Sequence, residues 1–438
     1  MRSASRSEEQ GVASESEPSP AAALAVRIVI AAWIVILIMI IRHRVFVSHD
    51  SISNYGHVWY VSERLWGGHG LPFRMPVIGH GAAYAFPYGF LPWITAALLH
   101  PLLGDWVVTL WLVLGTVGVI VATFWAFPEL RRGWWAATVL VNPAVVTAAI
   151  IGQLPFLWAM SFLLVGVGCW RRGRHWEAAV LVGIAQGTHP AVVLPIGVAL
   201  VLGWLPFEKQ PRALLRWYCL SLLITAPAVW IVFVSPVFLD ASTADIILNF
   251  FGTFIVRALV IFIPIAIIVF RRYLPWTWLG PGLFTLVLSL NLILLPVLST
   301  RYAWGALRRK PDTTLLSYID SSEFEKGATY RILRTADGKI GMYQLVQNGG
   351  HLDSEFFPES IHRRSYANLE AYSRFLRTRS VDYVIVFDDY DRRYHTNEHQ
   401  LLEKLVGDDA PACGREMVGA SRVTSDPTFD VYAIQREC

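Results

Sequence analysis

Asp50 is the side chain in this sequence best suited to acid–base chemistry. It lies in the segment HDSISNYGHVWY, residues 49–60, just after the first long apolar run, with His49, Asn54 and His57 as neighbours in the chain. A carboxylate within hydrogen-bond reach of a hydroxyl group can accept its proton as the oxygen attacks, which typically accelerates a reaction about 10²–10⁴-fold. Asp50 is therefore a candidate general base, with a helix N-cap or a solvated loop carboxylate as the alternative interpretation.

The composition indicates what kind of protein must position this side chain. Of the 438 residues, 54% are hydrophobic and only 16% are charged, whereas soluble domains carry about 25% charged residues. The mean hydropathy is +0.45, and the 18 tryptophans suit a protein with two membrane–water interfaces. A net charge of +4 is too small to indicate a nucleic-acid binder, and four cysteines exclude a disulfide-dense scaffold. The chain is predicted to be a polytopic α-helical membrane protein.

The apolar segments predict about nine membrane-spanning helices. Residues 1–22 are rich in Ser, Glu and Pro and predict a disordered tail, and the apolar run 23–41 is long enough to cross the hydrocarbon core. Residues 86–103 are apolar but interrupted by prolines, so we interpret them as a helix in the membrane interface, with a further span as the alternative. The other predicted spans are 106–127, 134–151, 154–170, 176–188, 191–206, 212–235, 250–270 and 276–299.

Basic residues decide between these two interpretations. Cytoplasmic loops carry an excess of Lys and Arg, and nine spans put four basic clusters inside, whereas a tenth span would put all four outside. The protein is thus predicted to be a multi-pass protein of the cell membrane with a cytoplasmic N-terminus and an extracytoplasmic C-terminal domain. The clusters are Arg131/Arg132, Arg171/Arg172/Arg174, Lys209/Arg212/Arg216 and Arg271/Arg272.

Residues 301–438 have the composition of a soluble domain. Charged residues are frequent there, and no window is apolar enough to span a membrane. Four short runs predict strands and two amphipathic stretches predict helices, which together make a small α/β domain. The predicted strands are 329–335, 341–347, 381–388 and 429–435, and the predicted helices are 366–380 and 397–406.

This topology gathers polar residues on the outer side of the membrane. Residues 42–105 form a long first external loop, and Gln153, His189 and Arg301 lie at external helix ends. Loops of such length in compact proteins are usually functional or contain helices of their own. Each polar residue also has a structural interpretation. Gln153 can hydrogen-bond a helix end, His189 can mark a helix break before a proline, and His57 can be a half-buried interfacial ring.

Several short motifs in this order resemble the GT-C superfamily, the membrane glycosyltransferases that use polyprenyl-phosphate sugars. The first external loop opens with Asp50, continues with Gly-x-Gly-x-Pro at 68–72, and has a Tyr- and Pro-rich segment at 84–92 before an apolar stretch. Residues 151–195 are similar to the bacterial mannosyl- and arabinosyltransferase-like branch. In that branch Gly-Gln starts one span, a basic turn and an Ala-rich span follow, and Lys-Pro or His-Pro closes the next. The resemblance covers roughly residues 24–300.

The resemblance implies an inverting transfer of a sugar from a polyprenyl-phosphate donor to a glycan, lipid or protein acceptor, with Asp50 as general base. The phosphate leaving group needs a cation or oriented donors but no general acid. Many members have a second acidic residue beside the first-loop Asp, where this chain has Ser51, so no cofactor is expected and a divalent metal stays open. The implied donor-phosphate ligands are Arg301, Arg42 and Arg44, the last two with contacts to membrane lipid as the alternative. The implied substrate-binding residues are His49, His57, Arg64, Tyr84, Tyr88, Gln153 and His189.

Two other function classes compete with this one. A non-catalytic relative that binds glycan or lipid in envelope assembly is favoured by Ser51. A transporter or flippase would need polar residues near the midplane of several spans, and Arg257 is the clearest such residue, with Asp240 or Asp245 as its expected partner. The acidic run 387–393 is interpreted as a loop at a strand end rather than a divalent-metal site.

The four cysteines fall into two pairs. Cys413 and Cys438 lie in the predicted outer domain, and the sequence leaves open whether they form a disulfide in an oxidising compartment. Cys169 and Cys219 lie in predicted spans and are expected to be inert packing residues.

Overall fold

The structure is a computed structural model that describes most of the chain in separate ranges. The predicted spans 250–270 and 276–299 lie outside them, so the count of nine spans stays a prediction. Arg257, Asp240, Asp245, Cys413 and Cys438 also lie outside the described residues. The ranges are 20–48, 51–72, 74–79, 82–83, 91–131, 133–208, 210–234, 305, 307–308, 313–333, 339–354, 365–387, 390–406 and 417–436.

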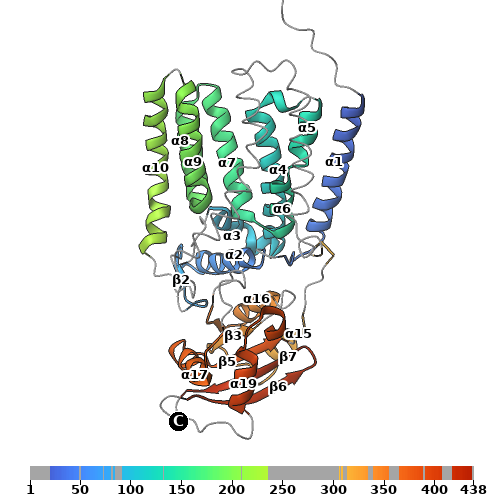
Figure 1. The fold of residues 1–438 in the computed structure, drawn as a ribbon, viewed down its shortest axis with the longest axis vertical. Coiled ribbons are helices and arrows are strands. Elements are labelled where there is room, and N and C mark those ends of the chain that lie inside the picture. The colour runs from blue at the N-terminus through green and yellow to red at the C-terminus, as the bar shows by residue number, and fades with distance from the viewer. Residues whose placement is uncertain are drawn as a thin grey trace, which may run out of the picture.

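A bundle of helices that lie side by side forms one end of the molecule (Figure 1). Four of its segments are long and apolar enough to cross a membrane, counted over the described residues: α1, α4, the α5–α6 pair and α7. Only 11% of the apolar window in α1 is buried inside the protein, as expected for a helix whose surroundings are lipid. The bounds are α1 Pro20–Ile41, α4 Trp106–Ala126, α5 Gly133–Leu140, α6 Pro143–Ile151, α7 Leu154–Arg171, α8 His175–Thr188, α9 Pro190–Trp204 and α10 Pro211–Val234.

These helices follow the predicted apolar segments closely, with breaks set by local chemistry. The predicted span 134–151 divides at Asn142, whose side chain accepts a hydrogen bond from the Ala144 amide and caps α6. Gly152 ends α6 in the left-handed conformation, at φ +80°, which glycine adopts without strain. His189 separates α8 from α9, and Pro190 opens α9. The first helix begins at Pro20, three residues before the predicted start of the span.

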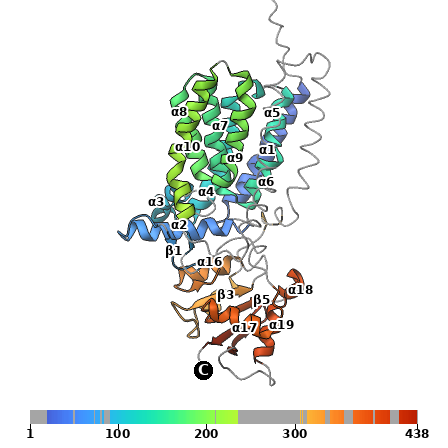
Figure 2. The ribbon, with the colours of Figure 1, turned by 60° about the vertical axis from the view of Figure 1, so that its left-hand side comes forward.

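Two helices of the first loop lie at one end of the bundle. α2, Ser51–Trp66, runs across the ends of the bundle helices, and α3, Leu91–Leu103, lies beside it (Figures 1 and 2). α3 has 13 described residues and is not among the described segments long enough to cross a membrane. Residues 86–90 lie outside the described residues, so the choice between an interfacial helix and a further span stays a prediction. A short hairpin between them pairs β1, Arg74–Met75, with β2, Ala82–Ala83.

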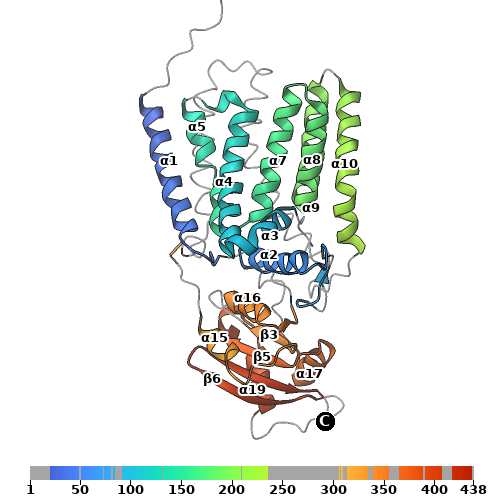
Figure 3. The ribbon, with the colours of Figure 1, turned by 180° about the vertical axis from the view of Figure 1, so that it is seen from behind.

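The C-terminal part folds around one mixed sheet with the strand order β4-β3-β5-β7-β6. β3 pairs in parallel with β4 and β5, and β7 pairs antiparallel with β5 and β6. Figure 3 shows the sheet and its helices as a separate body at the α2 end of the bundle. The elements are α15 Thr314–Ile319, β3 Thr329–Leu333, α16 Lys339–Gln347, β4 His351–Leu352, α17 Leu369–Thr378, β5 Tyr383–Phe387, α18 Tyr390–Tyr394, α19 Glu398–Val406, β6 Gly419–Asp426 and β7 Phe429–Gln435.

The sheet is buried on both faces because its central strand is apolar at every position. Val384 and Val386 of β5 belong to the cluster that includes residues of α17 and α19, whereas Ile385 and Phe387 belong to the cluster that includes residues of α16. Successive side chains of a strand point to opposite faces. A continuous apolar strand therefore indicates a sheet with helices on both sides.

One ionic group is buried among these layers. Arg331 of β3 donates two hydrogen bonds of 2.7 Å to the Glu398 carboxylate and one of 2.8 Å to Asp353. All three side chains are at most 3% exposed. Burial is the main cause that raises the pKa of Glu398, and Arg331 opposes that rise. Arg331 is the one cation that the two carboxylates of this group share. Removing its side chain would therefore leave two buried carboxylates without a partner charge.

The structure corrects three sequence-based expectations. Residues 341–347 were expected to be a strand but belong to helix α16, in which Ile340, Tyr343 and Val346 recur at a spacing of three and are buried. Strand β6 was not predicted, because its polar sequence GASRVTSD has no alternating apolar pattern. Cys219 was expected to be an inert packing residue but is exposed, whereas Cys169 is buried as expected.

Candidate functional site

The beginning of α2 is fixed against the turn between α6 and α7. Ser48 Oγ donates a hydrogen bond of 2.6 Å to the carbonyl of Ile150, and Asn54 Nδ2 donates one of 2.8 Å to the carbonyl of Gly152. A Cβ atom on Gly152 would lie 2.7 Å from Cβ of Ser51, so only glycine allows this approach. Ser48 and Ser51, which flank residues 49–50 in the chain, are thus held at the end of the bundle.

Asn54 also connects α2 to α3. Its Oδ1 accepts a hydrogen bond of 2.9 Å from the indole N–H of Trp93. The ring of His57 stacks on Trp93 with centroids 4.2 Å apart, and its Nδ1 lies 2.6 Å from the carbonyl oxygen of Ser53. Trp93 is fully buried. These contacts fix the orientation of the side-chain amide of Asn54 and of the imidazole of His57.

Gln153 and His189 lie at the ends of bundle helices next to this region. Gln153 follows Gly152 directly and precedes α7 as its N-cap residue, and His189 is the N-cap residue of α9. Phe156, one turn into α7, meets the ring of His189 edge-on at 6.2 Å between centroids. Both polar side chains are buried, with exposed fractions of 4% for Gln153 and 0% for His189.

These residues form one group that we call the polar cluster. Its side chains are hydroxyls, amides and imidazoles, which donate and accept hydrogen bonds without carrying a fixed charge. Polar groups that are buried in a protein are costly unless they are hydrogen-bonded, and such groups at the end of a bundle of apolar helices are functional candidates. The polar cluster consists of Ser48, Ser51, Asn54, His57, Gln153 and His189, all at most 4% exposed.

Three of the predicted arginines, Arg42, Arg44 and Arg64, lie within the described residues. Arg42 donates a hydrogen bond of 3.2 Å to the carbonyl of Leu307. Arg44 is 69% exposed at its side chain and pairs with Asp105 at 3.7 Å. Arg64 lies in the last turn of α2. No hydrogen bond or ion pair within the described ranges connects these arginines to the polar cluster.

The C-terminal domain contacts the first loop by extending its own sheet. The carbonyl of Leu352 in β4 accepts a hydrogen bond of 2.9 Å from the Gly79 amide, and the Leu352 amide donates one of 2.8 Å to the carbonyl of Val77. Ile78 and Leu352 thereby form a parallel bridge at the edge of the sheet. Main-chain pairing of this kind covers a sheet edge and fixes the loop to the domain.

A second contact joins α16 to the turn between α3 and α4. Tyr343 donates a hydrogen bond to the Asp105 carboxylate, and Gln347 Nε2 donates one of 2.6 Å to the Tyr343 hydroxyl. His100 Nε2 lies 3.5 Å from the same carboxylate. Burial, followed by the negative charge of Asp105, raises the pKa of Tyr343 well above its ordinary value. The hydroxyl therefore stays protonated and can keep donating.

The structure brings together part of the predicted site. His57, Gln153 and His189 belong to the polar cluster. Ser48 and Trp93 were missed, although an indole N–H in an apolar stretch indicates a need for a buried partner. The remaining predicted site residues, His49, Asp50, Tyr84, Tyr88 and Arg301, lie outside the described residues.

No family model matches the sequence of this chain, and no curated protein matches it. Within the described ranges, no three His, Cys, Asp or Glu side chains gather closely enough to hold a metal ion. In the C-terminal domain, the Asp391 carboxylate accepts hydrogen bonds from Thr396 Oγ1 at 2.6 Å and from the Gln400 amide at 3.1 Å. Asp391 thus accepts a hydrogen bond at the start of α19, and residues 390–393, which were interpreted as part of a loop, belong to the short helix α18.

Proposed function

We propose that this protein is an integral-membrane glycosyltransferase. It transfers a sugar from a polyprenyl-phosphate donor to a glycan, lipid or protein acceptor of the cell envelope, with inversion at the anomeric carbon. The reaction takes place at the end of the bundle that carries α2, α3 and the C-terminal domain, on the extracytoplasmic side. Asp50 is the general base.

The observation that carries this proposal is the polar cluster beside Asp50 in the sequence. Ser48 and Ser51 flank residues 49–50, and both are held against the bundle together with Asn54. A hydroxyl-rich sugar needs many neutral donors and acceptors in a fixed arrangement. The cluster supplies them at the end of apolar helices, where a lipid-linked donor and a water-borne acceptor can both arrive.

The chemistry requires one carboxylate and a means of stabilising the leaving phosphate. The acceptor hydroxyl oxygen attacks the anomeric carbon while Asp50 accepts its proton, and the bond from that carbon to the phosphate oxygen breaks with its electron pair. The polyprenyl phosphate leaves as an anion, so it needs cationic partners rather than a proton. Arg301 is the first candidate for this role, and Arg42, whose guanidinium reaches Leu307, is the second.

The polar cluster and the docked domain have supporting roles in this proposal. His57, stacked on Trp93, and the amide of Gln153 bind sugar hydroxyls, because both offer neutral hydrogen-bonding groups in a buried setting. The C-terminal domain, held through Leu352 and Tyr343, covers this end of the bundle and restricts the acceptors that can enter. Excluding bulk water also limits hydrolysis of the donor.

A non-catalytic protein that binds glycan or lipid is the second candidate. Ser51 favours it, because it stands where many GT-C members have a second acidic residue. Its hydroxyl exchanges hydrogen bonds with the backbone of Ser48, accepting from the amide at 2.7 Å and donating to the carbonyl at 3.2 Å. Ser51 therefore has a local structural role that is sufficient to explain a serine at this position.

The test uses membranes that contain the full chain and a panel of labelled polyprenyl-phosphate sugars. Transfer to endogenous acceptor is compared among the wild type, Asp50→Asn and Asp320→Asn at matched expression. Asp320 is an exposed carboxylate after α15 and serves as the control for loss of one negative charge. A photoreactive polyprenyl phosphate measures donor binding separately.

The proposal expects transfer by the wild type and by Asp320→Asn, with loss of transfer but not of donor binding in Asp50→Asn. Equal transfer by Asp50→Asn and the wild type would remove Asp50 from the mechanism. If the wild type and both variants bind the donor but none of them transfers the sugar, the result would support the non-catalytic protein instead.

A further inference from the structure

The segment that runs from α1 towards α2, residues 42–48, is held by side chains of α2 and α4, and we call it the linker. The amide of Phe46 donates a hydrogen bond of 2.8 Å to the Tyr55 hydroxyl. Thr109 Oγ1 lies 2.7 Å from the same hydroxyl and donates a longer hydrogen bond, of 3.4 Å, to the carbonyl of Arg44. A chain of hydrogen bonds therefore connects two positions of the linker through α2 and α4.

This chain of hydrogen bonds is buried. Phe46 and Thr109 are 0% exposed and Tyr55 is 1% exposed. Burial is the main cause that raises the pKa of Tyr55 above its ordinary value, and the charge of Asp105 acts in the same direction. The hydroxyl therefore keeps its proton and can donate to Thr109 while it accepts from the Phe46 amide. In a medium of low dielectric, consecutive hydrogen bonds strengthen one another, and losing one leaves a buried polar group unsatisfied.

Helix α16 of the C-terminal domain lies against these groups. It packs on α2, and the ring of Tyr343 meets the ring of Tyr55 with centroids 6.0 Å apart. The Tyr343 hydroxyl donates to the Asp105 carboxylate, which also pairs with Arg44 of the linker at 3.7 Å. Two short routes thus connect Tyr343 to the linker. The route through Asp105 is the weaker one, because the Arg44 side chain is 69% exposed.

Undocking of the domain would remove the cover from the chain of hydrogen bonds. Tyr343 is 1% exposed and belongs to the same apolar cluster as Phe46 and Tyr55. Without the Tyr343 ring, water reaches the Tyr55 hydroxyl and competes for the Phe46 amide, so this hydrogen bond holds the linker less firmly. The linker ends at Ser48, a member of the polar cluster that is bonded to the turn after α6. A change in docking would thus reach the polar cluster through the linker.

We propose that the C-terminal domain and the linker form one conformational unit, in which docking of Tyr343 tightens the linker and undocking loosens it. The hydrogen bond between Tyr55 and Thr109 is the part of the bundle that connects the two. Coupling free energies are reciprocal, so loosening the linker also weakens docking. The test reads amide exchange rather than sugar transfer, so this proposal and the glycosyltransferase proposal succeed or fail independently.

The experiment measures hydrogen exchange of the full chain in detergent by mass spectrometry. Thr109→Val removes the hydroxyl while keeping the shape of the side chain, and Thr109→Ser keeps the hydroxyl as a rescue variant. Thr116→Val is the matched control, because Thr116 lies two turns further along α4, is equally buried and donates within that helix, to the carbonyl of Leu112. Tyr55→Phe removes the neighbouring hydroxyl and replaces Thr109→Val if that variant does not purify.

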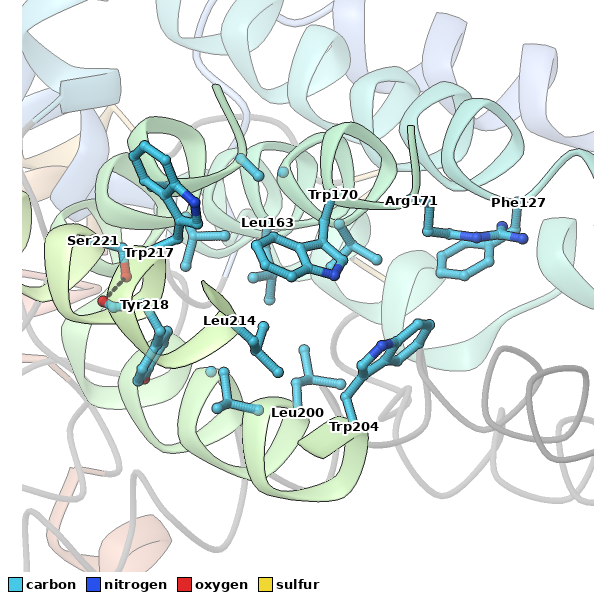
Figure 4. Close-up of a pocket in the computed structure, with 17 residues that line it drawn as sticks. Phe127, Leu163, Trp170, Arg171, Leu200, Trp204, Leu214, Trp217, Tyr218 and Ser221 are labelled. Carbon is cyan, nitrogen blue, oxygen red and sulfur yellow. Dashed lines mark hydrogen bonds between the residues drawn. The ribbon is translucent and has the colours of Figure 1, made fainter. Parts of the chain in front are cut away.

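The far end of the bundle serves as the internal reference. There α7, α8, α9 and α10 enclose a cavity of about 110 Å³, and Figure 4 shows Leu163, Leu200 and Leu214 gathered around it. The linker and α2 lie at the other end of these helices (Figure 1). A local change at Thr109 is therefore expected to leave the exchange of residues around the cavity unchanged.

Thr109→Val is expected to accelerate exchange of the linker about 2- to 12-fold, the effect of losing one neutral hydrogen bond. Exchange of residues 339–352 in the C-terminal domain is expected to rise at least about twofold. Because the Thr109 hydroxyl bonds to Tyr55 and to the linker, an effect on 339–352 passes through these groups. Thr116→Val and Thr109→Ser should exchange as the wild type does in both regions.

A double-mutant cycle distinguishes one unit from two independent contacts. Thr109→Val is introduced into the wild type and into Tyr343→Phe, and the exchange of 339–352 is compared. If the linker and the domain form one unit, Thr109→Val accelerates this exchange less in Tyr343→Phe, where docking is already weakened, than in the wild type.

Three results would overturn the proposal. Faster exchange of the linker without a change at 339–352 would show that the linker moves independently of the domain. Equal effects of Thr109→Val and Thr116→Val, or faster exchange around the reference cavity as well, would show a general loss of stability. Additive free-energy effects in the cycle would show that the two contacts do not act through each other.

Discussion

Tyr343→Phe is expected to weaken the attachment of the C-terminal domain to the bundle. The Tyr343 hydroxyl donates a hydrogen bond to the Asp105 carboxylate, and the side chain is only 1% exposed. A hydrogen bond to a charged group contributes about 1.5–3 kcal/mol, so its loss lowers the ratio of docked to undocked domain about 10- to 150-fold. The ring itself still packs, which confines the change to the hydroxyl.

Hydrogen exchange of the full chain in detergent measures this effect. The amides of 339–352 are expected to exchange faster in Tyr343→Phe than in the wild type, because α16 and β4 make the contacts with the first loop. Tyr318→Phe is the matched control, since Tyr318 is also buried but its hydroxyl bonds within the domain, to the carbonyl of Glu323. Unchanged exchange in Tyr343→Phe would refute the reasoning that this hydrogen bond holds the domain.

The same contact predicts an alkaline limit to docking. Burial and Asp105 raise the pKa of Tyr343 in the docked domain, whereas a solvated tyrosine has a pKa of about 10. A group whose pKa is raised in the folded state contributes stability that is complete below pH 10 and is lost as the pH rises above it. Exchange of 339–352 should therefore accelerate above pH 10 in the wild type, beyond the intrinsic pH dependence, and less so in Tyr343→Phe.

Two stability effects are expected elsewhere. Gly152→Ala should lower the free energy of unfolding by about 1–3 kcal/mol, because a φ of +80° is strained for alanine and the added Cβ would overlap Ser51. The midpoint of a thermal melt in detergent measures this loss of stability. An unchanged midpoint would contradict the expectation. Arg331→Met should lower the free energy of unfolding by about 3–5 kcal/mol, because it leaves two buried carboxylates without a cation. Arg374→Met removes the arginine of an exposed pair with Glu370 and should lower it by less than about 1 kcal/mol. Chemical denaturation measures both losses, and equal losses in the two variants would contradict the account.

The apolar pattern was sufficient to locate the described helices of the bundle. The bounds of α4, α7, α8, α9 and α10 lie within one or two residues of the predicted segments, because each boundary carries a proline, a glycine turn or a basic cluster. The strands β3, β5 and β7 were predicted for a similar reason, since apolar runs bounded by polar residues mark a buried strand.

The errors occurred where local pattern and tertiary environment disagree. Residues 341–347 contain enough apolar side chains for either a strand or a helix, and packing against α2 and α15 decides for the helix. β6 is an edge strand whose polar side chains carry no periodic signal, so only its pairing with β7 defines it. Pairing partners far apart in the chain cannot be read from a local pattern.

The candidate site was predicted by residue type but not by contact. Gln153 and His189 were expected at external helix ends and do lie in the polar cluster. Asn54, which joins Gly152 to Trp93, is the central residue of that cluster, and its role depends on contacts across 98 and 39 positions of the chain. Asp105 likewise acquires its role from Tyr343, which is 238 residues away.

The most direct test of the central claim is the transfer rate of purified Asp50→Asn, reconstituted with the polyprenyl-phosphate sugar that the wild type accepts. If Asp50 is the general base, the rate falls about 10²–10⁴-fold while a photoreactive donor analogue still labels the protein to the same extent. A rate within twofold of the wild type would contradict the account.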